Sequence, residues 1–216
     1  MTEAWLRGPV EGVPALLMPV AHSLTDAVEE VEAVVDLEPA ALWSRPAGVA
    51  SVGFHLRHIP GALDRLLTYA RGEQLTDDQL RYLAIEGEPG EPPATAASLL
   101  ERLRRSVADA IDVLRDTPEG SLLEPRGVGR RGLPSNVLGL LFHAAEHTRR
   151  HAGQVIATAA IVRDRRSDAR LPRGALLAAV SAWEDAGLRG LCADGRLDVA
   201  VDALRARGIA VSEEPS

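Results

Sequence analysis

Apolar residues recur every three or four positions along most of the chain, which is the spacing of a helix that buries one face. The pattern predicts four long helices, over residues 15–35, 51–71, 95–114 and 134–162. Alanine and leucine, which favour helix, dominate the composition, whereas aromatic residues, which favour strands, make up only 3%. The chain is therefore predicted to be all-α, with its long helices packed as a four-helix bundle.

Local signals refine these helices. Ser51 can cap the second long helix, and Pro60 inside that helix removes one backbone donor, so we expect a kink there. Thr76 and Gln79 have the spacing of a capping box, which predicts a short additional helix. Residues 116–134 are rich in glycine and proline and are predicted to form a long irregular connection.

The last part of the chain differs from the bundle. Residues 164–170 are predicted to form a charged break after the fourth long helix, and residues 172–216 are typical of two short helices. We therefore divide the chain into a bundle, residues 1–165, and a C-terminal helical extension, residues 166–216. The extension has too many large apolar residues for a solvated tail, so we expect it to pack on the bundle or on a second chain. These apolar residues are Leu176, Val180, Trp183, Leu188, Leu191, Val199, Val201 and Leu204.

Charge and cysteine content exclude several classes of function. With 31 acidic against 24 basic residues the net charge is −7, whereas a nucleic-acid-binding surface needs clustered positive charge. The single cysteine, Cys192, cannot form an intramolecular disulfide, and the N-terminal residues lack a signal-peptide pattern, so a cytoplasmic location is expected. No apolar stretch reaches the roughly 18 residues that suggest a membrane span. Nucleic acids and membranes are therefore not expected as partners.

The candidate chemistry is concentrated in histidines. Five of the six fall in two groups, His55 and His58 on the second long helix and His143, His147 and His151 on the fourth, while His22 stands apart. Histidine is the commonest metal ligand, and residues four apart on a helix lie on the same face. His147 and His151 can therefore offer two imidazoles to one ion, with a third from a facing helix. Three imidazoles that leave a coordination position free are typical of a catalytic metal site.

Helical geometry decides between these histidines only in part. At about 100° per residue, His147 and His151 lie on one flank of the apolar stripe of their helix, and His143 is rotated outward. On the second long helix, His55 lies within the apolar stripe and His58 lies on its flank. The periodicity therefore slightly favours His55 as the inward histidine, although a kink in this helix could change the direction of either side chain.

Two segments resemble motifs of a known family. Residues 51–59, with the sequence SVGFHLRHI, and the DRLL at residues 64–67 resemble the second-helix motif of the DinB/YfiT-like superfamily. Residues 141–154 resemble its final-helix motif, His-x-x-x-His-x-Gly-Gln, and the resemblance extends over about residues 15–165. It implies a four-helix bundle that holds a divalent ion, commonly zinc or nickel, on three histidines.

By their position in these motifs, the implied metal ligands are His58, His147 and His151. His58 is implied because the family ligand precedes an apolar residue, as His58 precedes Ile59. The motif and the periodicity therefore disagree on the second helix, and His55 stays the alternative ligand there.

The DinB/YfiT-like superfamily includes thiol-dependent transferases and a mycothiol-dependent isomerase. The resemblance implies a metal-dependent transferase or isomerase that acts on a low-molecular-weight thiol and an electrophilic substrate, because a metal on neutral histidines can keep a thiol as its thiolate. The alternative is a non-catalytic bundle, serving in stress response or protein interaction, whose metal site is structural or vestigial. DinB-like bundles often look dimeric, so a homodimer is a further expectation.

Overall fold

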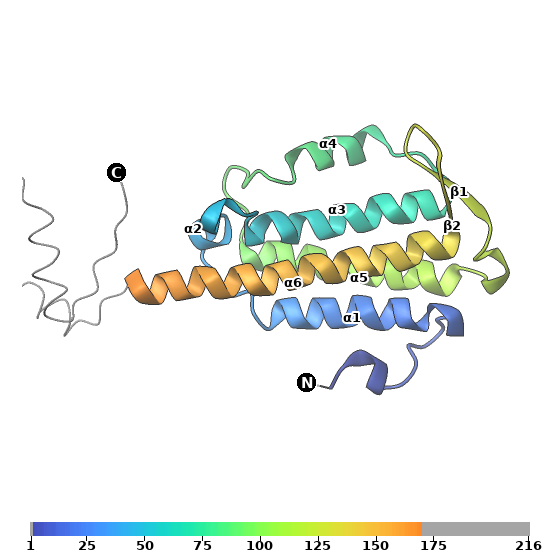
Figure 1. The fold of residues 1–216 in the computed structure, drawn as a ribbon, viewed down its shortest axis with the longest axis horizontal. Coiled ribbons are helices and arrows are strands. Elements are labelled where there is room, and N and C mark those ends of the chain that lie inside the picture. The colour runs from blue at the N-terminus through green and yellow to red at the C-terminus, as the bar shows by residue number, and fades with distance from the viewer. Residues whose placement is uncertain (1, 170–216) are drawn as a thin grey trace, which may run out of the picture. The chain divides into compact units, whose positions relative to one another are not determined.

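The computed structural model describes residues 2–169, with side chains as far as Asp164. The extension predicted beyond the last long helix, from residue 170 onward, lies outside the described residues. Four long helices lie side by side in the described part (Figure 1), which confirms the all-α class. They are α1 (Met18–Glu32), α3 (Val52–Ala70), α5 (Ala96–Asp116) and α6 (Val137–Ala169). None of the described helices combines the length and the apolar character needed to cross a bilayer.

Smaller elements connect the long helices. Two of them are short α-helices, α2 (Pro39–Leu42) and α4 (Asp77–Ile85). Four are 3₁₀ turns, η1 (Ala4–Leu6), η2 (Ala15–Leu17), η3 (Pro46–Gly48) and η4 (Glu119–Ser121). The strands β1 (Pro125–Val128) and β2 (Leu133–Asn136) precede α6. Of these elements, α4 matters most for the site, because it lies along α3 at the edge of the bundle (Figure 1).

The predicted apolar stripes form the core. One leucine from each long helix shows the pattern: Leu24, Leu63, Leu103 and Leu141 are each no more than 1% exposed. By its spacing Leu16 falls on the apolar stripe of the helix predicted over residues 15–35, but it is 63% exposed. Leu16 belongs to η2, which is a 3₁₀-helix. A 3₁₀-helix has about 3.0 residues per turn, whereas an α-helix has about 3.6, so the α-helical spacing assigns Leu16 to the wrong face.

The predicted caps of α3 and α4 are confirmed. The Ser51 hydroxyl accepts a hydrogen bond from the Phe54 amide at the start of α3, and α3 runs as one helix through Pro60. Thr76 and Gln79 form the reciprocal capping box that begins α4. Both helices therefore begin where their own polar side chains satisfy free backbone amides.

The prediction of an irregular connection before the last helix is wrong in its second half. Strands β1 and β2 pair antiparallel, with Pro125 opposite Asn136 and Val128 opposite Leu133. Gly129 and Gly132 close the hairpin with positive φ, which glycine adopts at little cost, so the turn residues that suggested a loop in fact allow the strands to pair. The fourth long helix consequently begins at residue 137. Asn136 directly precedes it, and the Asn136 side chain accepts a hydrogen bond from the Gly139 amide in its first turn.

The predicted charged break after the fourth long helix is also wrong over residues 164–169. Helix α6 continues through this stretch to Ala169. The stretch contains arginine, aspartate, serine and alanine, but neither glycine nor proline. Charged residues alone cost a helix little, whereas glycine and proline interrupt it, so charge was a poor signal for a helix end.

Candidate metal centre

Three histidines from α3 and α6 form a compact group. His58 of α3 and His147 and His151 of α6 each offer a ring nitrogen, and these three atoms all lie within 4.8 Å of one another. All three side chains are half-buried. The structure thus brings together the three residues that the motif implied, from helices that are far apart in sequence but packed side by side.

Both ring nitrogens of His58 have a polar partner. Its Nε2 lies 2.9 Å from Nε2 of His147, so this nitrogen faces the group of three. Its Nδ1 lies 2.7 Å from Oε2 of Glu86, on the side away from the group. The ring of Phe54 stacks on that of His58, with 5.3 Å between ring centroids. Both the rotation and the tilt of the His58 ring are therefore set by neighbouring side chains.

His55, the alternative ligand, lies behind the group rather than in it. It is only 4% exposed, as the apolar periodicity indicated, but its Nδ1 lies 3.0 Å from Nδ1 of His151. This contact occupies Nδ1 of His151 and leaves Nε2 of that ring for an ion. The periodicity correctly predicted that His55 is buried, whereas burial by itself did not select the histidine that joins His147 and His151.

The two remaining histidines lie apart from the group. His143 is half-exposed, its ring centroid is 5.6 Å from that of His147, and its Nδ1 is 3.3 Å from a carboxylate oxygen of Glu146. His22 lies on α1, where its Nε2 is 2.9 Å from the backbone carbonyl of Gly8. The expectation that His143 points outward and that His22 stands alone agrees with these positions.

The environment keeps the buried histidines neutral. Burial lowers the pKa of His147 to about 4 and that of His151 to about 3, and the proximity of His58 adds to both effects. Burial also lowers the pKa of His55 to about 4, again with a smaller contribution from His58. Imidazole binds metals in its neutral form, so His147 and His151 are in the ligating state at neutral pH.

One residue of the site, Glu86, was missed in the sequence. It directly follows α4, is 2% exposed, and places its second carboxylate oxygen, Oε1, 2.6 Å from Nη1 of Arg65 on α3. Glu86 therefore joins His58 to Arg65. Glutamates 88 and 91 follow in the same loop and are exposed, and no periodic pattern distinguishes Glu86 from them, so no sequence signal could have singled it out.

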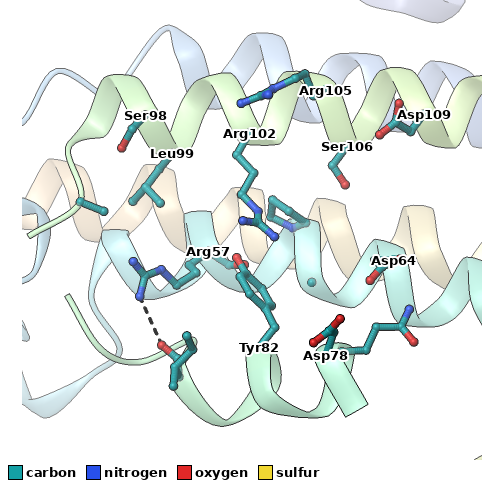
Figure 2. A pocket seen from close by; sticks show the side chains of 15 residues that line it. Arg57, Asp64, Asp78, Tyr82, Ser98, Leu99, Arg102, Arg105, Ser106 and Asp109 are labelled. Carbon is teal, nitrogen blue, oxygen red and sulfur yellow. Dashed lines mark hydrogen bonds between the residues drawn. The ribbon is translucent and has the colours of Figure 1, made fainter. Parts of the chain in front are cut away.

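A cleft of about 890 Å³ lies between α3, α4 and α5 (Figure 2). Arg102 reaches across it from α5, and its guanidinium lies 4.2 Å from the centre of the Tyr82 ring of α4. Arg57 of α3 donates to the carbonyl of Ile85 at the end of α4. Among the described residues, no histidine lines this cleft. Helix α4 and Gly61 of α3 contribute to its wall, and Gly61 also lies against the carboxylate of Glu86.

The donor set fits a transition-metal ion. Three imidazole nitrogens suit zinc, nickel, copper or iron, whereas magnesium and calcium prefer carboxylate and carbonyl oxygens. The Nδ1 atom of His58 contacts Glu86, and the Nδ1 atom of His151 contacts His55. A metal-binding histidine usually has such a hydrogen-bond partner on the ring nitrogen that does not bind the metal. With three ligands from the protein, a fourth tetrahedral position would be open.

Comparison with known proteins agrees with this geometry. The sequence profile of the DinB superfamily matches residues 20–155, which is more than half of the chain and contains His58, His147 and His151. A search among curated proteins found no match. The helical fold and the matched range, with the three histidines inside it, place the chain in a family: it belongs to the DinB superfamily.

Proposed function

We propose that this protein binds one divalent transition-metal ion, zinc or nickel, through His58, His147 and His151, and acts as a transferase or isomerase on a low-molecular-weight thiol. The observation that carries the proposal is the convergence of three imidazoles from two helices, whose ligand atoms lie within 4.8 Å of one another. Membership of the DinB superfamily supports it. An electrophilic small molecule would be the second substrate.

The side chains of the site have two kinds of role, binding the ion and positioning its ligands. The two α6 histidines and His58 would hold the ion, and Glu86 and His55 hold the outer nitrogens of His58 and His151. When bound, the ion would supply Lewis acidity and lower the pKa of a thiol ligand, so that the thiol is present as the nucleophilic thiolate. Burial lowers the pKa of His147 and that of His151, so these two rings are neutral at neutral pH, and all three rings of the group are only half-buried.

The first test is metal content. Protein purified without a histidine tag should contain about one transition-metal ion per chain, measured by inductively coupled plasma mass spectrometry. His147→Ala should lose most of this metal, because it removes one of three ligands. His143→Ala is the matched control, since His143 lies one helical turn away and is half-exposed, and it should retain the metal. Equal metal content in wild type and His147→Ala would refute the assigned ligands.

The second test asks whether the site accepts a thiol. Protein loaded with cobalt in place of the native ion should change its visible spectrum when a small thiol is added, because a sulfur ligand introduces a charge-transfer band. An open fourth position predicts this change at millimolar thiol. A spectrum that no small thiol alters would argue for a closed structural site and against the proposed chemistry.

A further inference from the structure

Helix α4 is attached to the bundle in an unusual way. Every residue of α4 in the described structure is at least partly exposed, and Leu80, Leu83 and Ile85 are 38–46% exposed. The buried residue is instead Glu86, a carboxylate, immediately after the helix. A buried carboxylate is costly unless it is paired and hydrogen-bonded, so the partners of Glu86 decide whether α4 can dock.

Glu86 has a partner on each oxygen. Oε1 accepts from Nη1 of Arg65 at 2.6 Å, and this guanidinium supplies the neutralising charge. Oε2 lies 2.7 Å from Nδ1 of His58. A carboxylate can only accept hydrogen bonds, so this contact requires the His58 proton on Nδ1. The lone pair of His58 is then on Nε2, the nitrogen that faces His147.

A glycine on α3 allows this approach. A Cβ atom at Gly61 would lie 2.3 Å from Oε1 of Glu86 and 2.6 Å from the Tyr82 ring. Any larger residue at position 61 would displace the Glu86 carboxylate and the Tyr82 ring from their places against α3. The close approach of the carboxylate is therefore built into both helices.

Further polar contacts hold α4 on α3. Nε2 of Gln79 donates to the Thr68 hydroxyl at 2.8 Å, and the Tyr82 hydroxyl donates to the Arg57 carbonyl at 2.9 Å. Figure 2 shows Tyr82 extending from α4 into the cleft, toward Arg102. With little apolar burial of its own, α4 is expected to open more easily than the core helices, and Glu86 contributes a large part of its attachment.

We propose that Glu86 is a positioning residue of the metal centre and that it couples the docking of α4 to metal binding. This inference rests on the proposed function only in requiring that His58 binds an ion. Glu86 holds His58 in the tautomer and orientation that present Nε2 to the ion, and Arg65 holds Glu86. Thermodynamic coupling is reciprocal. If the docking of α4 increases the metal affinity by a certain factor, bound metal increases the equilibrium constant for docking of α4 by the same factor.

The coupling is tested by zinc affinity, measured by competition with a chromophoric chelator. Glu86→Gln keeps the size of the side chain but removes its charge. Gly61→Ala keeps every proposed ligand and the carboxylate, but its added methyl group displaces the Glu86 carboxylate and the Tyr82 ring from α3. Each should bind zinc roughly 10- to 100-fold more weakly, the usual effect of losing such a carboxylate. Glu88→Gln is the matched control, because Glu88 is exposed in the same loop, and it should bind like wild type.

Hydrogen exchange measures the reciprocal effect. Zinc should slow amide exchange across residues 77–86 in the wild-type protein and in Glu88→Gln, but should slow it much less in Glu86→Gln and Gly61→Ala. If Glu86→Gln does not fold, the zinc affinity of Gly61→Ala and nitrogen NMR of the wild-type histidines still test the role of Glu86. Zinc-loaded wild type should show His58 protonated on Nδ1.

The outcomes separate this inference from the proposed function. If wild type binds neither zinc nor nickel, both are overturned. If wild type binds zinc tightly, and Glu86→Gln and Gly61→Ala bind it as well as Glu88→Gln does, the proposed metal centre stands and the role of Glu86 is refuted. Zinc-loaded His58 protonated on Nε2 would also refute it.

Discussion

Replacing His58 with alanine should weaken zinc or nickel binding by more than about 100-fold, whereas His55→Ala should weaken it only about 10-fold. His58 presents Nε2 to the other two histidines, so its loss removes a proposed ligand. His55 contacts Nδ1 of His151 from behind, so its loss frees one ring to rotate but removes no ligand. The two variants differ only in position, since each truncates the same side chain on the same helix.

Chelator competition on both variants, with circular dichroism to confirm that each is folded, measures this difference. The reverse order of affinities would show that His55 is the third ligand and that the apolar periodicity of α3 was the better guide. Equal and small effects would mean that neither histidine of α3 binds the ion.

Leu103→Ala should lower the free energy of unfolding by about 2–5 kcal/mol, whereas Leu123→Ala should change it by no more than about 0.5 kcal/mol. Leu103 is 1% exposed on α5 and faces the other long helices, so its truncation leaves a cavity that close-packed neighbours cannot fill. Leu123 is 75% exposed in the connection after α5. Helix α5 supplies none of the clustered histidines, so the loss of stability should not be a loss of ligands.

Denaturant unfolding of the metal-free proteins measures both values, because bound metal would add its own stabilisation to the folded state. A Leu103→Ala variant as stable as wild type would contradict the arrangement of the four-helix core. A large effect of Leu123→Ala would contradict the exposed position of this leucine.

The helices of the bundle were predictable because their signals are local. Ser51 and Thr76 lie at the starts of α3 and α4, where their hydroxyls satisfy free backbone amides. The spacing of apolar residues predicted the buried face of each long helix. The errors arose where a local signal is ambiguous: glycines such as Gly129 suit a loop and a hairpin turn equally, and a charged stretch does not end a helix.

The spacing of residues along the chain predicted the all-α class, the apolar faces of the long helices and two groups of histidines at helical spacing. The choice between His55 and His58 required the packed structure, because periodicity reports burial but not the atoms that a buried ring contacts. Only the tertiary structure revealed Glu86, because its role depends on Arg65 and His58, which lie 21 and 28 residues away in the chain. Such contacts depend on how α4 docks against α3, and docking at Gly61 is a property of two surfaces together rather than of either segment alone.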